Sequence, residues 1–187
     1  MLTTSAVSRE SSAEGERQVR RASLAHADAL FRLARRLTGS VADAEDLVQE
    51  TYARAFAPGA GLARAEKPEA WLYRVLRNAF IDGDRRRRGG IERLADDGAP
   101  PDRAEEPAAL RDDLEAAPLR QLVARDIQAA LLRLGAEARL IVLLDQEGMT
   151  ETEIAGVLDC AVGTVKSRLW RARAALREIL GEYRHER

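Results

Sequence analysis

The apolar positions of the chain recur every three to four residues, which is the period of an amphipathic helix. The first such stretch runs from Ala22 to Leu37, and Gly39 follows it as a residue that commonly ends a helix. The same period predicts further helices over residues 43–56, 68–87, 119–134 and 138–144. Because no stretch alternates with the period of a strand, the pattern predicts an all-α protein.

The stretch after residue 149 predicts two helices separated by a tight turn. Thr150 is a favourable N-cap, and Glu153 stands three residues later, as in a capping box. The first helix is therefore expected over Glu151–Leu158, the turn over Asp159–Ala161, and the second helix over Val162–Leu176. This arrangement is typical of a helix-turn-helix.

The second of these helices has two contrasting faces. On a helical wheel its apolar stripe consists of Val162, Val165, Leu169, Ala172 and Leu176. Trp170 falls on the opposite face, flanked by Lys166 and Arg171, and the stretch from Val162 to Arg177 contains five basic residues and no acidic one. A basic face with an exposed aromatic ring suits the major groove of DNA. The alternative is a solvated basic helix in a bundle, but a large ring facing away from the core needs a partner.

Composition limits the other classes of function. The chain has 187 residues and a net charge of -1, so nucleic-acid binding has to come from local patches. One cysteine and two histidines exclude an internal disulfide and a Cys/His metal cluster. We find no catalytic constellation, so we expect neither an enzyme nor a cofactor. No apolar run is long enough to span a membrane and no signal peptide is visible, so we expect a cytoplasmic protein.

Charge and glycine or proline content divide the chain into four parts. Residues 1–20 are polar and predict a disordered tail. Residues 21–88 and 118–180 carry the helical patterns and predict two small domains. Residues 89–117 between them predict a flexible linker, since nine acidic and three basic residues lie between Ile91 and Ala116.

The run from Glu153 to Arg173 resembles region 4 of the extracytoplasmic-function (ECF, group 4) sigma factors of bacterial RNA polymerase, within the sigma-70 family. The segment Val162-Gly-Thr-Val-Lys-Ser-Arg followed by Arg171-Ala-Arg is the most specific part of this resemblance. It implies contacts with the promoter −35 element, and we expect Arg171 to bind a guanine through two hydrogen bonds. The residues expected to contact the −35 element are Thr164, Lys166, Ser167, Trp170 and Arg171.

The run Asp43-Ala-Glu-Asp-Leu-Val-Gln-Glu is similar to sigma region 2.2. In that family the region binds a coiled coil on the clamp of the polymerase β′ subunit. The resemblance assigns this contact to Asp46, Gln49 and Glu50, whose outward acidic patch could pair with arginines of a partner helix. Without the resemblance, the patch is an ordinary solvated surface.

The run from Trp71 to Asp82 resembles regions 2.3 and 2.4, which recognise and melt the −10 element. Asn78 matches the position that meets a flipped base, and its amide can both donate to and accept from a base edge. We expect Trp71 to pack in the core instead, and Tyr73 to lie on or near the outer face of this helix. The run Arg85–Arg88 can bind phosphate directly. The other residues expected to contact the −10 element are Arg74, Arg77, Arg85, Arg86 and Arg87.

Together the two resemblances imply an alternative sigma factor that directs core RNA polymerase to specific promoters. They imply a monomer whose partners are the polymerase β′ clamp and β flap, promoter DNA and a cognate anti-sigma factor. One alternative is a stand-alone helix-turn-helix regulator that binds operator DNA, usually as a dimer. A second alternative is a helical protein-interaction scaffold without sequence preference.

Overall fold

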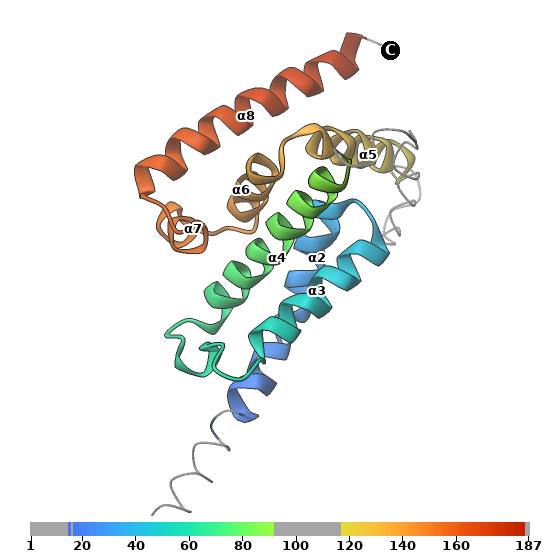
Figure 1. The fold of residues 1–187 in the computed structure, drawn as a ribbon. Coiled ribbons are helices and arrows are strands. Elements are labelled where there is room, and N and C mark those ends of the chain that lie inside the picture. Colours follow the sequence, from blue (N-terminus) through green and yellow to red (C-terminus); the bar gives the residue numbers. More distant parts are fainter. Residues whose placement is uncertain (1–14, 16, 92–116, 186–187) are drawn as a thin grey trace, which may run out of the picture.

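The computed structural model describes residues 15, 17–91 and 117–185, and every regular element among them is a helix, as predicted. Residues 17–24 are helical, so part of the expected tail, residues 17–20, belongs to a helix. The rest of the tail and most of the expected linker lie outside the described residues. Numbered as in Figure 1, the elements are α2 (Ala27–Thr38), α3 (Val41–Ala55), the 3-10 turn η1 (Leu62–Arg64), α4 (Pro68–Ile91), α5 (Ala117–Arg133), α6 (Ala136–Gln146), α7 (Glu151–Leu158) and α8 (Val162–His185).

Several helices begin or end at residues that cap them. Ser40 accepts a hydrogen bond from the Asp43 amide at 3.3 Å and begins α3. Gly39 ends α2 with a φ of 79°, a left-handed conformation that glycine adopts without strain. The predicted capping box of α7 is present, because the Thr150 side chain bonds to the Glu153 amide while the Glu153 carboxylate bonds to the Thr150 amide.

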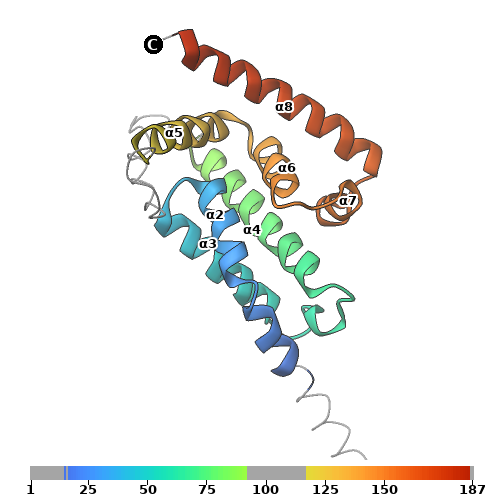
Figure 2. The ribbon, with the colours of Figure 1, turned by 180° about the vertical axis from the view of Figure 1, so that it is seen from behind.

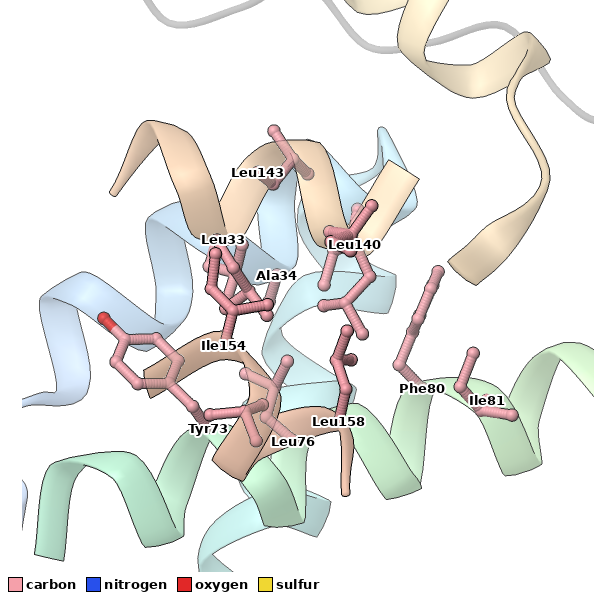
Figure 3. Close-up of a cluster of buried hydrophobic side chains, with 14 of the residues drawn as sticks. Leu33, Ala34, Tyr73, Leu76, Phe80, Ile81, Leu140, Leu143, Ile154 and Leu158 are labelled. Carbon is pink, nitrogen blue, oxygen red and sulfur yellow. The ribbon is translucent and has the colours of Figure 1, made fainter. Parts of the chain in front are cut away.

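Helix α4 lies in the middle of the molecule (Figures 1 and 2). It packs against α3 on one side and against α7 on the other, and α6 also contacts it. Figure 3 shows Tyr73, Leu76, Phe80 and Ile81 of α4 on the side that faces α6 and α7. The buried side chains of both halves of the chain therefore form one continuous core.

Tyr73 differs from the sequence-based expectation. Its position on the helical wheel placed it on or near the outer face of α4, whereas its side chain is only 5% exposed. Burial is also the main reason that the pKa of the Tyr73 hydroxyl is raised. The wheel showed the face of α4 that meets its own domain but not the second face, which region 117–185 covers.

Arg139 joins the two halves through backbone carbonyls. Its guanidinium donates to the carbonyls of Leu131, Leu132 and Leu134 at 2.8–3.0 Å, near the C-terminal end of α5. It also donates to the carbonyl of Leu37 in the last turn of α2. One side chain therefore satisfies helix-end acceptors from two helices that are far apart in the sequence.

A network of charged side chains connects α3 with α4. Arg54 donates to Asp82 at 2.9 Å and to Glu50 at 2.6 Å, and Arg86 lies 3.6 Å from Glu50. The hydrogen bond from Arg54 is the main reason that the pKa of the Asp82 carboxyl is lowered. The ionised form of Asp82 is therefore favoured by the folded state.

We predict that Thr150→Ala lowers the free energy of unfolding by about 1 kcal/mol, because α7 loses its N-terminal cap. Urea denaturation followed by circular dichroism measures the change. Thr152→Ala is the matched control, since Thr152 is exposed within the same helix and alanine has the higher helix propensity. Equal destabilisation by both variants would contradict a specific capping role.

We predict that Asp82→Asn makes the free energy of unfolding less dependent on pH in the acidic range. Because the pKa of Asp82 is lowered in the folded state, its stabilising contribution is present above its ordinary pKa and disappears as the pH falls through the folded value. The urea midpoint of the wild type should therefore fall further than that of the variant between about pH 7 and about pH 3. Asp46→Asn is the control, and it should retain the wild-type pH dependence.

Candidate nucleic-acid interface

Helix α8 exposes the face that the sequence predicted. Val165, Leu169 and Ala172 are at most 4% exposed, whereas Trp170 on the opposite side is 69% exposed. Val162, expected in the apolar stripe, is 37% exposed because it lies at the very start of the helix, beyond the packed core. Of the residues expected at the −35 element, Thr164 is half-buried. The other four are exposed: Lys166, Ser167, Trp170 and Arg171.

The basic residues of α8 fall into two groups by their partners. Arg168 and Arg173 turn toward α6, where they pair with Glu137 at 3.5 Å and Asp145 at 2.6 Å. Arg171 instead stays on the outer face, where its Nε donates to the Ser167 carbonyl of its own helix at 3.3 Å. Arg171 is therefore available to a ligand on the outer face, whereas Arg168 and Arg173 are engaged with α6.

Lys166 and Ser167 also have local partners. The Lys166 ammonium lies 3.5 Å from a Glu151 carboxylate oxygen at the start of α7, although its side chain remains 63% exposed. Ser167 donates to the Thr164 carbonyl at 3.0 Å. Exposed pairs of this kind are weak in water, so a phosphate group could replace Glu151 as the partner of Lys166.

The polar face of α4 carries the second group of predicted residues. Asn78 is exposed, and its side-chain oxygen accepts a hydrogen bond of 2.9 Å from Arg77. Arg85, Arg86 and Arg87 are exposed near the C-terminal end of the helix. The structure thus brings an amide and several guanidinium groups together along one helix.

Arg74 is the exception on α4. Its guanidinium donates to the Gly156 carbonyl of α7 through Nε at 3.1 Å and Nη2 at 2.7 Å. The sequence had placed Arg74 among the residues expected to contact DNA. In this structure it contacts the other half of the chain instead.

Helix α3, which carries the acidic residues, and helix α8 lie on opposite sides of α4 (Figures 1 and 2). Asp46 and Gln49 are exposed, as expected for a surface that binds a partner. Glu50 is only partly exposed, because it pairs with Arg54 and Arg86. The sequence analysis missed Arg54, although its spacing of four residues from Glu50 on one helix was a visible signal.

Among residues 15, 17–91 and 117–185, no group of His, Cys, Asp and Glu side chains could hold a metal ion. No helix in the described part of the chain is long and apolar enough to cross a membrane.

Comparison with protein families matches both halves of the chain. The Sigma-70 region 2 family model matches residues 24–90, and the Sigma-70, region 4 model matches residues 124–176. Relatives include the ECF RNA polymerase sigma factor SigL of Mycobacterium tuberculosis, which is 39% identical over 85% of its own length and 84% of this chain. SigE of Mycolicibacterium smegmatis is also 39% identical over 86% of this chain, which spans 61% of that relative.

Solved structures with a similar fold include one of a sigma factor. The sigma factor RpoE from Bartonella quintana, solved with the anti-sigma factor NepR, matches with a TM-score of 0.65 and 29% identity, covering 84% of this chain and 93% of RpoE. CnrH, solved with the cytosolic domain of CnrY, matches with a TM-score of 0.57 over 91% of this chain and 95% of CnrH, and its 24% identity supports the fold alone.

The joint match decides between the alternatives raised by the sequence. A helix-turn-helix regulator that binds operator DNA alone would account for the region 4 match but not for the region 2 match. Relatives that share both regions over most of this chain are named as ECF sigma factors. The chain therefore belongs to the ECF RNA polymerase sigma factors, the alternative sigma factors that direct core RNA polymerase to specific promoters.

Proposed function

We propose that α8 reads the −35 element of the promoters that this sigma factor selects. The observation that carries the proposal is the outer face of α8, where Trp170 and Arg171 are exposed while Val165 and Leu169 anchor the opposite side in the core. Arg171 is our choice for a guanine contact, and Trp170 would pack against a sugar or a thymine methyl group. Thr164, Lys166 and Ser167 would bind neighbouring phosphates or base edges.

The −10 element would bind along α4. Asn78 would meet an unstacked base, because its amide can pair with a base edge. The basic residues near it would bind phosphates, which strengthens binding without adding sequence preference. This group comprises Arg74, Arg77, Arg85, Arg86 and Arg87.

The polymerase would bind at α3. Asp46 and Gln49 are exposed on the outer side of that helix, where carboxylate and amide groups could pair with basic side chains of the β′ clamp. Glu50 would contribute only if it exchanged Arg54 and Arg86 for a partner residue. The domain with residues 118–180 would contact the β flap, while residues 21–88 would form the domain that binds the clamp and the −10 element.

Further properties follow from this role. The chain would work as a monomer in the cytoplasm, without catalysis of its own, since the polymerase performs the chemistry. The neighbour RpoE was solved with an anti-sigma factor, and we propose that an anti-sigma factor also controls this chain. Transcription by purified core polymerase from a promoter library, with and without the chain, tests the proposal. Transcripts from a particular subset of the promoters should appear only when the chain is present.

We predict that Arg171→Ala relaxes preference at one −35 base pair, with a loss of discrimination of about 1–3 kcal/mol. The measurement is sequencing of transcripts from a library randomised across the −35 element. Arg173→Ala is the matched control, because Arg173 pairs with Asp145 of α6. An unchanged preference with Arg171→Ala, in a protein with a wild-type circular dichroism spectrum, would exclude Arg171 from base recognition.

We predict that Asp46→Lys weakens binding to core polymerase by about tenfold or more, since a hydrogen bond to a charged group contributes about 1.5–3 kcal/mol. Folding should be unaffected, because Asp46 is exposed. Fluorescence anisotropy of the labelled chain titrated with core polymerase measures the affinity. Asp28→Lys, at an exposed position of α2, is the charge-matched control, and an equal loss in both variants would argue against a specific site at α3.

A further inference from the structure

A cavity of about 530 Å³ lies between the two halves of the chain. Its lining comes from the segment around His26 that begins α2, from the start of α4 and from the turn between α6 and α7. Cavities of this size are in the range that binds small organic molecules. None of the residues named above for contacts with DNA or with the polymerase clamp lines it.

Three carboxylates at this cavity have no ion pair within the described part of the chain. Glu66 and Glu69 stand at the start of α4 and are exposed, whereas Glu147 directly follows α6 and is half-buried. The neighbouring Lys67 and Glu153 also line the cavity, but they lie 3.3 Å apart and neutralise each other. The lining therefore carries an excess of negative charge.

The hydroxyl of Tyr73 faces the same cavity. The side chain is only 5% exposed, and Figure 3 shows its oxygen at the end of the ring that points away from Leu76. This hydroxyl makes no hydrogen bond to any residue that the structure describes, although polar groups buried this far usually have a partner. Burial raises the pKa of the hydroxyl most, the carboxylates of Glu69 and Glu147 raise it further, and Arg32 acts in the opposite direction. The hydroxyl and these two carboxylates therefore lie close enough for one ligand to contact all of them.

The lining fits the chemistry of an aliphatic amine. A protonated amine offers a positive charge and N–H donors, which carboxylates accept in strong hydrogen bonds, and a phenolic oxygen can accept another. Pro68, Ala70 and Met149 supply apolar surface against which methylene groups can pack. Among the described residues no group of side chains could hold a metal ion, so an organic cation suits the cavity better than a bare one. Because the carboxylates come from both halves of the chain, two ammonium groups joined by methylenes can be bound at once.

We propose that this cavity binds a small aliphatic diamine, with its ammonium groups at the carboxylates of Glu69 and Glu147 and a hydrogen bond to the hydroxyl of Tyr73. The site is separate from the surfaces proposed for DNA and polymerase, and the proposal does not rest on them. It adds a site for a small molecule to a chain whose other proposed ligands are macromolecules. A diamine bound here contacts both halves, so it raises the stability of the folded chain.

Isothermal titration calorimetry of the full chain with putrescine measures the affinity. Butanediol, which has the same carbon chain without charge, and magnesium chloride, which supplies charge without methylene groups, are the comparison ligands. We expect saturable binding of one putrescine per chain, no binding of butanediol, and magnesium binding at least about tenfold weaker than that of putrescine. Putrescine should also raise the midpoint of thermal unfolding.

Variants locate the site. The double variant Glu69→Gln with Glu147→Gln removes two of the charges, and Tyr73→Phe removes only the hydroxyl. Each should weaken putrescine binding by about tenfold or more, since each removes a hydrogen bond to a charged group. The control Asp28→Asn with Glu45→Gln removes the same charge at exposed positions outside the cavity, and it should bind putrescine as the wild type does. Circular dichroism checks that all variants are folded.

Any of four results would overturn the inference. They are the absence of saturable putrescine binding by the wild type, equal affinity for magnesium and putrescine, wild-type affinity in Tyr73→Phe, and equal weakening in the cavity double variant and its charge-matched control. None of these measurements involves promoter DNA or polymerase. Their outcome therefore leaves the function proposed above untouched, and the transcription assay tests that function separately.

Discussion

The burial of α4 on two sides is the constraint on which the rest of this structure depends. Leu72 and Leu76 are fully buried, and Tyr73 and Val75 are nearly so, although at 100° per residue Tyr73 and Val75 point about 160° apart, too far for one stripe of a helix. A helix covered on two sides keeps only a narrow polar strip for ligands. That strip contains Asn78 and Arg77, so the surface left to a nucleic acid is defined by the packing around it.

The distribution of charged side chains over the surface follows from the same packing. With a net charge of -1, the protein as a whole does not attract DNA, and binding depends on where the charges are placed. Pairs such as Arg173 with Asp145 neutralise basic groups of α8 that point toward α6. The outer face retains Arg171 beside Trp170, which concentrates positive charge and an aromatic ring where a duplex could approach.

Much of the fold and the exposed face of α8 could be predicted because their signals are local. The capping box at Thr150, the glycine at the end of α2 and the outward position of Trp170 each depend on residues within a few positions of one another. The contacts between the halves could not be predicted, because they join residues about a hundred positions apart, as in the bond from Arg139 to the Leu37 carbonyl. Tyr73 was misplaced for the same reason, since its partners belong to the other half of the chain.

The packing of α7 on α4 leaves the proposed binding sites unequally accessible, and this inequality suggests an order of events. Asp46 and Gln49 on α3 and Trp170 on α8 are exposed while α7 covers α4. A polymerase could therefore dock on α3 before the halves separate, whereas Arg74 becomes available only afterwards. If polymerase binds surfaces of the two halves at sites that are far apart, its affinity is higher for a chain whose halves have separated than for one whose halves are packed together. This difference in affinity would favour separation of the halves. If α4 is the −10 surface, as proposed, binding of polymerase and binding of the promoter would then be linked through the side chains of α4 that α7 covers.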